Sequence, residues 1–128
     1  THRTAALYMR GARLNPGDPD KELAWVDHKQ LAFLISLPDK PADLVLTLHV
    51  PEWIPRQSFT LDINGKKLEQ RFEIWPAKPF WQEVVIDVPR QLNREGNDFV
   101  SLHFESLAQS PEAPSLRAAV LLQSITVQ

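Results

Sequence analysis

The residues best suited to bind a ligand are tryptophans in two loops that contain prolines. Residues 51–57 carry Trp53, and residues 75–81 begin and end with a tryptophan. A loop tryptophan can lie flat against the apolar face of a pyranose ring, while polar side chains bond the hydroxyl groups. The predicted binding platform consists of Trp53, Trp75, Trp81, Glu52, Arg56 and Lys78. The alternative is that these tryptophans cap the hydrophobic core, because large aromatic side chains are mostly buried.

The two tryptophan loops are predicted to lie at the same end of the molecule. Two strands joined by a turn separate them, so a simple up-and-down path returns the chain to the end from which it started. Proline lowers the entropy that a loop loses when it is held for binding, which favours preorganised platforms. We therefore expect a ligand to bind at this end. A jelly-roll crossover between the loops could instead place them at opposite ends.

An acidic segment near the start of the chain is the candidate metal site. Asp18, Asp20 and Glu22 offer hard oxygen ligands of the kind that calcium prefers. Their spacing fits no EF-hand, and two prolines and a lysine interrupt residues 15–22, so a solvated acidic loop is the favoured interpretation. The four histidines are scattered, which argues against zinc. We expect no cofactor and no bound metal.

The sequence carries no signature of a catalytic site. It has no cysteine, no Gly-x-Ser-x-Gly turn and only four dispersed glycines, so thiol chemistry, a nucleophile elbow and a phosphate loop are all unsupported. A pair of acidic residues for glycoside hydrolysis can never be placed from sequence alone. We expect a chain that is not an enzyme.

Composition predicts one globular domain over residues 1–128. The net charge is −2, and the longest basic run is the pair Lys66 and Lys67, so nucleic acid is not an expected partner. No apolar run approaches the length of a membrane-spanning helix. The first residue is Thr1 rather than Met, which suggests a segment of a larger protein. A glycan or another domain of that protein is the expected partner.

Residues 58–72 predict a β-hairpin. Phe59, Leu61 and Ile63 alternate with polar residues in the period-2 pattern of a half-buried strand. Asn64 and Gly65 tolerate the positive φ angles of a type I′ turn. A two-residue loop would pair residue 63 with 66, 62 with 67 and 61 with 68, which places apolar residues on one face and opposite charges on the other.

Other alternating runs predict an all-β fold of about eight or nine strands. Strands are expected at 4–10, 23–26 (a short edge strand), 30–37, 44–50, 82–88 and 99–104, with a helical turn at 90–96 and a loop at 106–115. Residues 116–127 suit a helix or a strand, and a strand is favoured. No helix is long enough to connect parallel strands, so an antiparallel two-sheet sandwich, with jelly-roll topology, is predicted. Its expected core is Phe33, Ile35, Leu46, Leu48, Leu61, Ile63, Ile86, Leu102 and Phe104.

The order of these features resembles the galactose-binding-domain-like jelly rolls. The resemblance lies in residues 44–50 leading to the Asn64 and Gly65 turn, residues 84–89 followed by 96–102, and the closing runs 116–117 and 122–127. It covers about residues 40–128 and leaves residues 1–29, an N-terminal strand and acidic loop, without a counterpart. Within that superfamily the chain looks most like accessory domains appended to bacterial membrane-bound glycosyltransferases and other glycan-handling proteins.

That resemblance implies a non-catalytic module for carbohydrate recognition or assembly in a bacterial envelope glycan system. It implies a location on the extracytoplasmic side, either periplasmic or at the cell surface. Such domains bind ligands through variable loops, so the resemblance assigns no residue. The alternative function is a structural or protein-interaction sandwich with no sugar ligand. The two differ in whether the loop tryptophans meet a sugar or a protein surface.

Overall fold

The computed structural model describes residues 2–3, 9–10, 12–14, 24–38, 40–76, 80–89, 98–113 and 115–128. Every regular element in this part of the chain is a β-strand, and every strand pairing is antiparallel. The predictions for residues 4–8, 15–22 and 90–96 and for Lys78 concern positions outside it. The all-β antiparallel prediction is confirmed.

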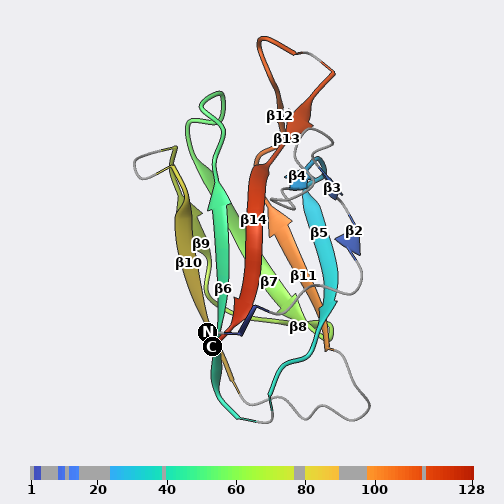
Figure 1. Cartoon of the computed structure of the whole chain (residues 1–128), viewed down its shortest axis with the longest axis vertical. Coiled ribbons are helices and arrows are strands. Elements are labelled where there is room, and N and C mark those ends of the chain that lie inside the picture. The colour runs from blue at the N-terminus through green and yellow to red at the C-terminus, as the bar shows by residue number, and fades with distance from the viewer. Residues whose placement is uncertain are drawn as a thin grey trace.

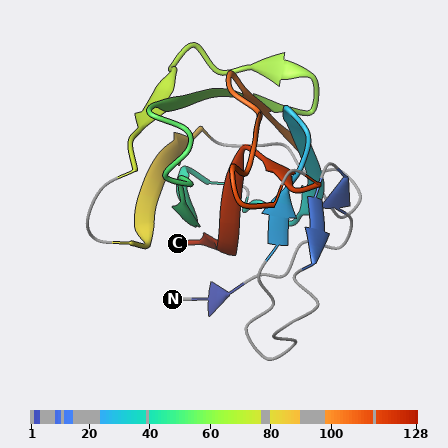
Figure 2. The same cartoon turned by 90° about the horizontal axis from the view of Figure 1, so that it is seen from above.

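The strands form two facing sheets, which Figure 2 shows from above. The β6 sheet has the order β10 (Gln82–Val88), β6 (Ala42–His49), β14 (Val120–Val127), β4 (Ala24–Val26) and β3 (Ala12–Leu14), and β1 (His2–Arg3) pairs with β14. The β7 sheet has the order β2 (Met9–Arg10), β5 (Gln30–Ile35), β11 (Asp98–Phe104), β7 (Gln57–Ile63) and β8 (Lys66–Lys67), and β9 (Phe72–Ile74) pairs with β7. A short ribbon of β12 (Ala108–Gln109) and β13 (Arg117–Ala118) extends from one end (Figure 1).

The predicted core lies between the two sheets. All nine predicted core residues are buried. Phe59 adds an aromatic centre, because its ring lies 5.1 Å from that of Phe72 and 5.4 Å from that of Phe104. Burial of the inward-facing residues of both sheets is the main stabilising contribution to such a sandwich.

The predicted hairpin is confirmed in its register and its turn. Ile63 pairs with Lys66 and Asp62 pairs with Lys67. Asn64 has φ of 53° and Gly65 has φ of 82°, both in the left-handed region that a type I′ turn requires. The Leu68 amide donates to the Leu61 carbonyl oxygen at 2.9 Å, so the chain stays beside β7 just beyond β8.

Two sequence predictions at the strand level need correction. The strand at 23–26 is not an edge strand, because β4 pairs with β14 on one side and with β3 on the other. The expected loop at 106–115 contains β12. Both errors concern two- and three-residue strands, which are too short for an alternating pattern to be recognised. The last segment is the favoured strand, β14, with a bulge between Leu122 and Ser124.

Candidate functional site

The two tryptophan loops do lie at the same end of the sandwich, as the sequence predicts. β10 is antiparallel to β6, and β9 is antiparallel to β7. The chain therefore leaves β6 and β9 at the same end at which it enters β7 and β10. Figure 1 shows the turn after β6 and the start of β10 at the upper end, with the β12–β13 ribbon.

A row of side chains on three neighbouring strands forms the base of a site at this end. Leu121 of β14 pairs with Trp25 of β4 on one side and with His49 of β6 on the other. Directly paired residues point to the same face of a sheet. Leu48 and Val26, the chain neighbours of His49 and Trp25, are core residues, so this row lies on the outer face of the β6 sheet.

The turn after β6 brings a second tryptophan over this row. The Ile54 amide donates to the Pro51 carbonyl oxygen at 3.0 Å, which closes a turn with Glu52 and Trp53 at its centre. Ile54 is buried and anchors the turn to the core. The Trp53 ring lies 6.3 Å from the Trp25 ring at an angle of 31°.

Trp53 is held by both packing and hydrogen bonding. The side chain is half-buried against the core cluster, and Nε1 donates to the Ala108 carbonyl oxygen at 3.3 Å. An indole has one polar atom, so this bond leaves the rest of the ring as an apolar surface. Trp53 thus packs on the core, as one of the two alternatives predicts, and it also borders a pocket.

Phe80 closes the other side of the row. Its ring stacks on the His49 imidazole with centroids 3.5 Å apart and an angle of 12° between the planes, and Trp81 packs edge-on against Phe80 at 5.1 Å. Nδ1 of His49 lies 3.0 Å from the Phe80 carbonyl oxygen. A carbonyl oxygen only accepts, so Nδ1 carries the proton and Nε2 of the neutral ring is an acceptor.

The β12–β13 ribbon supplies the last wall. The amide of Ser110 donates to the Leu116 carbonyl oxygen at 2.8 Å, and Ser110 Oγ accepts from the Ala113 amide at 3.3 Å. These bonds fix the turn that carries Glu112. The ribbon is also joined to the turn after β6 by the Trp53 hydrogen bond to Ala108.

Together these parts enclose a cavity of about 480 Å³, which we call the loop-end pocket. Its lining residues are Trp25, His49, Pro51, Glu52, Trp53, Phe80, Ser110, Pro111, Glu112 and Leu121. They come from segments that are far apart in the sequence. The volume lies in the range typical of small-molecule sites, about 300–1,000 Å³. Aromatic rings with a few polar groups are the lining that such sites usually have.

A buried glutamine joins three segments that lead into the loop end of the sandwich. Gln57 is fully buried at the start of β7. Its Nε2 donates to the carbonyl oxygens of Ser106 at 2.8 Å and Ala119 at 3.0 Å. Its Oε1 accepts from the amides of Ser106 at 2.9 Å and Ser58 at 3.2 Å. These bonds hold together the start of β7, the approach to the ribbon and the residue before β14.

The structure divides the residues of the predicted platform. Trp53 and Glu52 line the loop-end pocket. Trp75 is 49% exposed but does not line it, Trp81 packs beside Phe80, and Arg56 is exposed away from the lining. Lys78 lies outside the described residues. The binding role of all six remains a prediction.

Sequence reasoning missed most of the other lining residues. Phe80 lay inside the predicted loop, and its neighbours on either side, a proline and Trp81, were the signal that could have identified it. His49 carried no signal in the sequence that would place it beside a ligand. Trp25 and Glu112 had no local signal, because only the pairing of distant strands brings them to the pocket.

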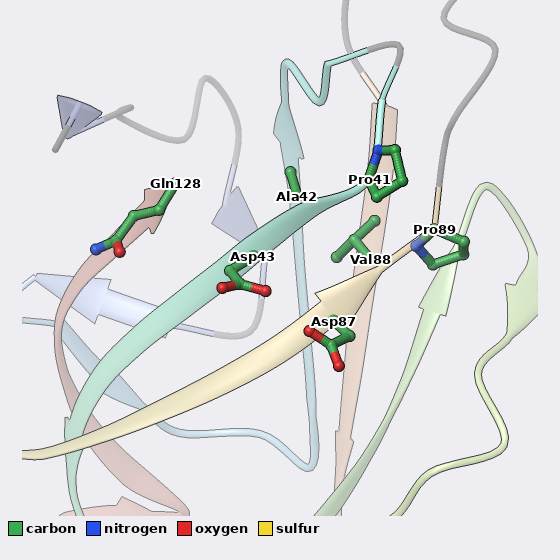
Figure 3. Close-up of a pocket in the computed structure, with 7 residues that line it drawn as sticks. All are labelled: Pro41, Ala42, Asp43, Asp87, Val88, Pro89 and Gln128. Atoms are coloured by element: carbon green, nitrogen blue, oxygen red, sulfur yellow. The ribbon is translucent and has the colours of Figure 1, made fainter.

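A second cavity, of about 410 Å³, lies at the opposite ends of β6 and β10 (Figure 3). We call it the proline-end pocket; it is lined by Pro41, Ala42, Asp43, Asp87, Val88, Pro89 and Gln128. Asp43 and Asp87 are paired across the two strands. A hydrogen bond with Asp87, desolvation and the negative charge of Asp87 raise the pKa of Asp43 above its ordinary value. None of the described residues that line this cavity is aromatic.

The described residues contain no group of three or more His, Asp or Glu side chains arranged to hold a metal ion. The candidate calcium ligands Asp18, Asp20 and Glu22 lie outside those residues, so their prediction is not tested. In the same described part of the chain, no helix is long and apolar enough to cross a membrane.

The sequence matches no protein-family model and no curated protein, but the fold matches solved structures. CBM35 from Paenibacillus barcinonensis aligns with a TM-score of 0.60 at 12% identity, covering 98% of this chain and 95% of that one. A family 35 carbohydrate binding module from an environmental isolate gives a TM-score of 0.65 at 14% identity, covering 98% and 87%.

The same fold occurs inside a larger enzyme. The cycloalternan-forming enzyme from Listeria monocytogenes, solved in complex with a pentasaccharide substrate, aligns with a TM-score of 0.63 at 13% identity. The match covers 98% of this chain and 11% of the enzyme. At such identities the similarity establishes the fold alone. The chain therefore has a β-sandwich fold that it shares with these family 35 carbohydrate binding modules.

Proposed function

We propose that this chain is a non-catalytic carbohydrate-binding module that holds its sugar in the loop-end pocket. The observation that carries the proposal is the pocket itself, in which Trp25, Trp53 and Phe80 meet from three distant segments. Solved structures with the same fold include carbohydrate-binding modules, which supports the same class of ligand here.

The chemistry of the pocket suits a pyranose. Its aromatic rings offer apolar faces for the C–H side of the sugar. Glu52 and Glu112 can accept hydrogen bonds from hydroxyl groups, and Nε2 of His49 is an acceptor because Nδ1 is bonded to the Phe80 carbonyl oxygen. The bonds that fix Trp53 and the ribbon preorganise the pocket, which lowers the entropy lost on binding.

The cellular role that we propose is recognition or assembly in a bacterial envelope glycan system, on the extracytoplasmic side. The support for this context is the sequence resemblance to accessory domains of bacterial glycan-handling proteins. A non-catalytic role is supported by the absence of a nucleophile or triad signature in the sequence and by the binding modules among the matching structures.

The test is to titrate the chain with a panel of neutral, amino and acidic oligosaccharides and to follow tryptophan fluorescence. For a glycan that binds, Phe80→Ala should weaken affinity about five- to tenfold, because a stacking ring is lost. Phe80 is 52% exposed, so the melting temperature should hardly change.

Trp75→Ala is the matched control. Trp75 is an exposed aromatic residue of the same loop that does not line the pocket, so its loss should leave affinity unchanged. Weaker binding in Trp75→Ala with normal binding in Phe80→Ala would move the site to the platform predicted from sequence. If no glycan in the panel binds the parent chain, the protein-interaction alternative replaces the proposed function.

A further inference from the structure

The acidic and basic side chains that line the loop-end pocket, among the residues that the structure describes, are two glutamates and a histidine. Glu52 and Glu112 line the cavity, His49 is its one basic residue, and its described lining contains no lysine or arginine. The two glutamates come from separate turns, the one after β6 and the one between β12 and β13. The two glutamates give the described lining two negative charges, and it contains no lysine or arginine to offset them.

The aromatic rings of the pocket, like its glutamates, attract a positively charged group. The faces of Trp25, Trp53 and Phe80 carry the negative side of the ring quadrupole. An ammonium group is attracted to such a face, and a carboxylate is repelled. The glutamates and the rings therefore both favour a positively charged ligand. Both glutamates are exposed, so solvent weakens their contribution.

Building on the proposed function, we propose that the loop-end pocket selects sugars with a free amine. A glycan containing glucosamine would bind more tightly than its N-acetylated counterpart, and a uronic acid would bind most weakly. In this arrangement the pyranose ring lies against an aromatic face, and its ammonium group lies among Glu52, Glu112 and the ring faces.

The strand register also pairs one position of β3 with Trp25. Arg13 of β3 pairs with Trp25 of β4, whereas Leu121 pairs with Trp25 from the other side. Arg13 is thus one strand further out than the base of the pocket, at the end of the strand order. The variant Arg13→Ala measures whether this position changes the preference between amine and carboxylate.

The experiment measures the affinity of the full chain for three tetrasaccharides, of glucosamine, N-acetylglucosamine and galacturonate, at a pH that protonates the amine. We expect glucosamine to bind about three- to tenfold more tightly than N-acetylglucosamine, the range given by one or two exposed charge pairs. Raising the salt to about 0.5 M should reduce this preference, because the charges are then screened. Galacturonate should bind least.

The double variant Glu52→Gln/Glu112→Gln should weaken binding of the glucosamine glycan more than binding of the N-acetylated glycan, so that the salt-sensitive preference for the amine is lost. The control is Glu69→Gln, which removes an exposed glutamate just after β8 that does not line the pocket. This control should retain the preference of the parent chain. Arg13→Ala should retain it as well.

Two kinds of result would overturn the proposal and differ in what they mean. The inference fails, with the proposed function intact, if the N-acetylated glycan or galacturonate binds as tightly as glucosamine. It fails in the same way if the preference survives the double glutamine variant or disappears in Arg13→Ala. Binding of none of the three sugars would count against both the amine preference and the proposed function.

Discussion

The two ends of β6 and β10 carry cavities of similar size with very different linings. The loop-end pocket, of about 480 Å³, is surrounded by aromatic rings, whereas the proline-end pocket, of about 410 Å³, is lined by prolines, small aliphatic groups and paired aspartates. The same two strands support both cavities. Cavity volume therefore does not distinguish a candidate ligand site here, and the chemistry of the lining does.

The difference arises from the connections rather than from the sheets. At the loop end, distant segments are joined by side-chain bonds to main-chain oxygens, namely those of Trp53 and Gln57. At the proline end, Asp43 and Gln128 exchange main-chain hydrogen bonds at 2.9 and 2.8 Å, which continue the ladder of β6 and β14. The first end depends on particular side chains, and the second is held by ordinary sheet pairing.

The largest expected effect is on the core that both ends share. Leu61→Ala should lower the free energy of unfolding by about 2–5 kcal/mol, because the variant loses buried apolar surface and leaves a cavity. Leu61 is fully buried. Urea denaturation measures this change. A loss below about 1 kcal/mol would mean that the surrounding side chains and strands move to fill the space left by the leucine.

A smaller effect, confined to the loop end, is expected from Gln57→Leu. The variant leaves buried main-chain groups of Ser106 and Ala119 without partners, which should cost about 1–3 kcal/mol. Gln82→Leu is the control, because it removes an exposed bond to the Trp75 carbonyl oxygen and should cost about 0.5 kcal/mol or less. Hydrogen exchange should show lost protection near Ser106 and normal protection near Asp43. An equal loss of protection near Ser106 and near Asp43 would contradict the conclusion that only the loop end depends on the side chain of Gln57.

Trp53→Ala separates the two roles of that residue. We expect a stability loss of about 1–2 kcal/mol, below the value for a fully buried tryptophan, because the side chain is half-buried. Glycan affinity should fall in the same variant, unlike Phe80→Ala, which should change affinity alone. Thermal melting and fluorescence titration of the two variants provide the comparison. Unchanged melting of Trp53→Ala would show that the ring belongs to the pocket and contributes little to the core.

The smallest expected effect lies at the proline end. The pKa of Asp43 is raised in the fold, first by the hydrogen bond with Asp87, so the folded state retains a proton that the unfolded chain has lost. Stability therefore falls as pH rises from the ordinary aspartate pKa through the raised one, and the full penalty is present at neutral pH. Asp87→Asn should raise the melting temperature at neutral pH by about one degree.

The gain from Asp87→Asn should disappear in acid, where Asp43 is protonated in both states. Glu83→Gln on the same strand is the matched control, because Glu83 faces Thr47 rather than a carboxylate. Melting curves at neutral and acidic pH measure both variants. A gain of the same size at every pH, or one shared by Glu83→Gln, would contradict the coupling of the two aspartates. Glycan affinity should be unchanged.

Local patterns predicted the fold well, because strand alternation and turn chemistry are set by neighbours in sequence. The Asn64 and Gly65 turn and the core position of Leu61 are examples. The shared end of the two tryptophan loops was also predictable, since one hairpin separates them. The base of the pocket could not be predicted in this way. Trp25, Leu121 and His49 meet only because the strands take the order β4, β14, β6, and no local signal in the sequence encodes that order.

The bulge in β14 determines which change in chain length this strand can accept. Leu122 pairs with Leu48 and Ser124 pairs with Thr47, so the residues on either side of Gln123 already face consecutive partners. Deleting Gln123 would join them into a regular ladder and keep Ile125 facing the core beside Leu46. A one-residue deletion away from the bulge, such as Thr126, would instead turn Val127 to the opposite face of the sheet.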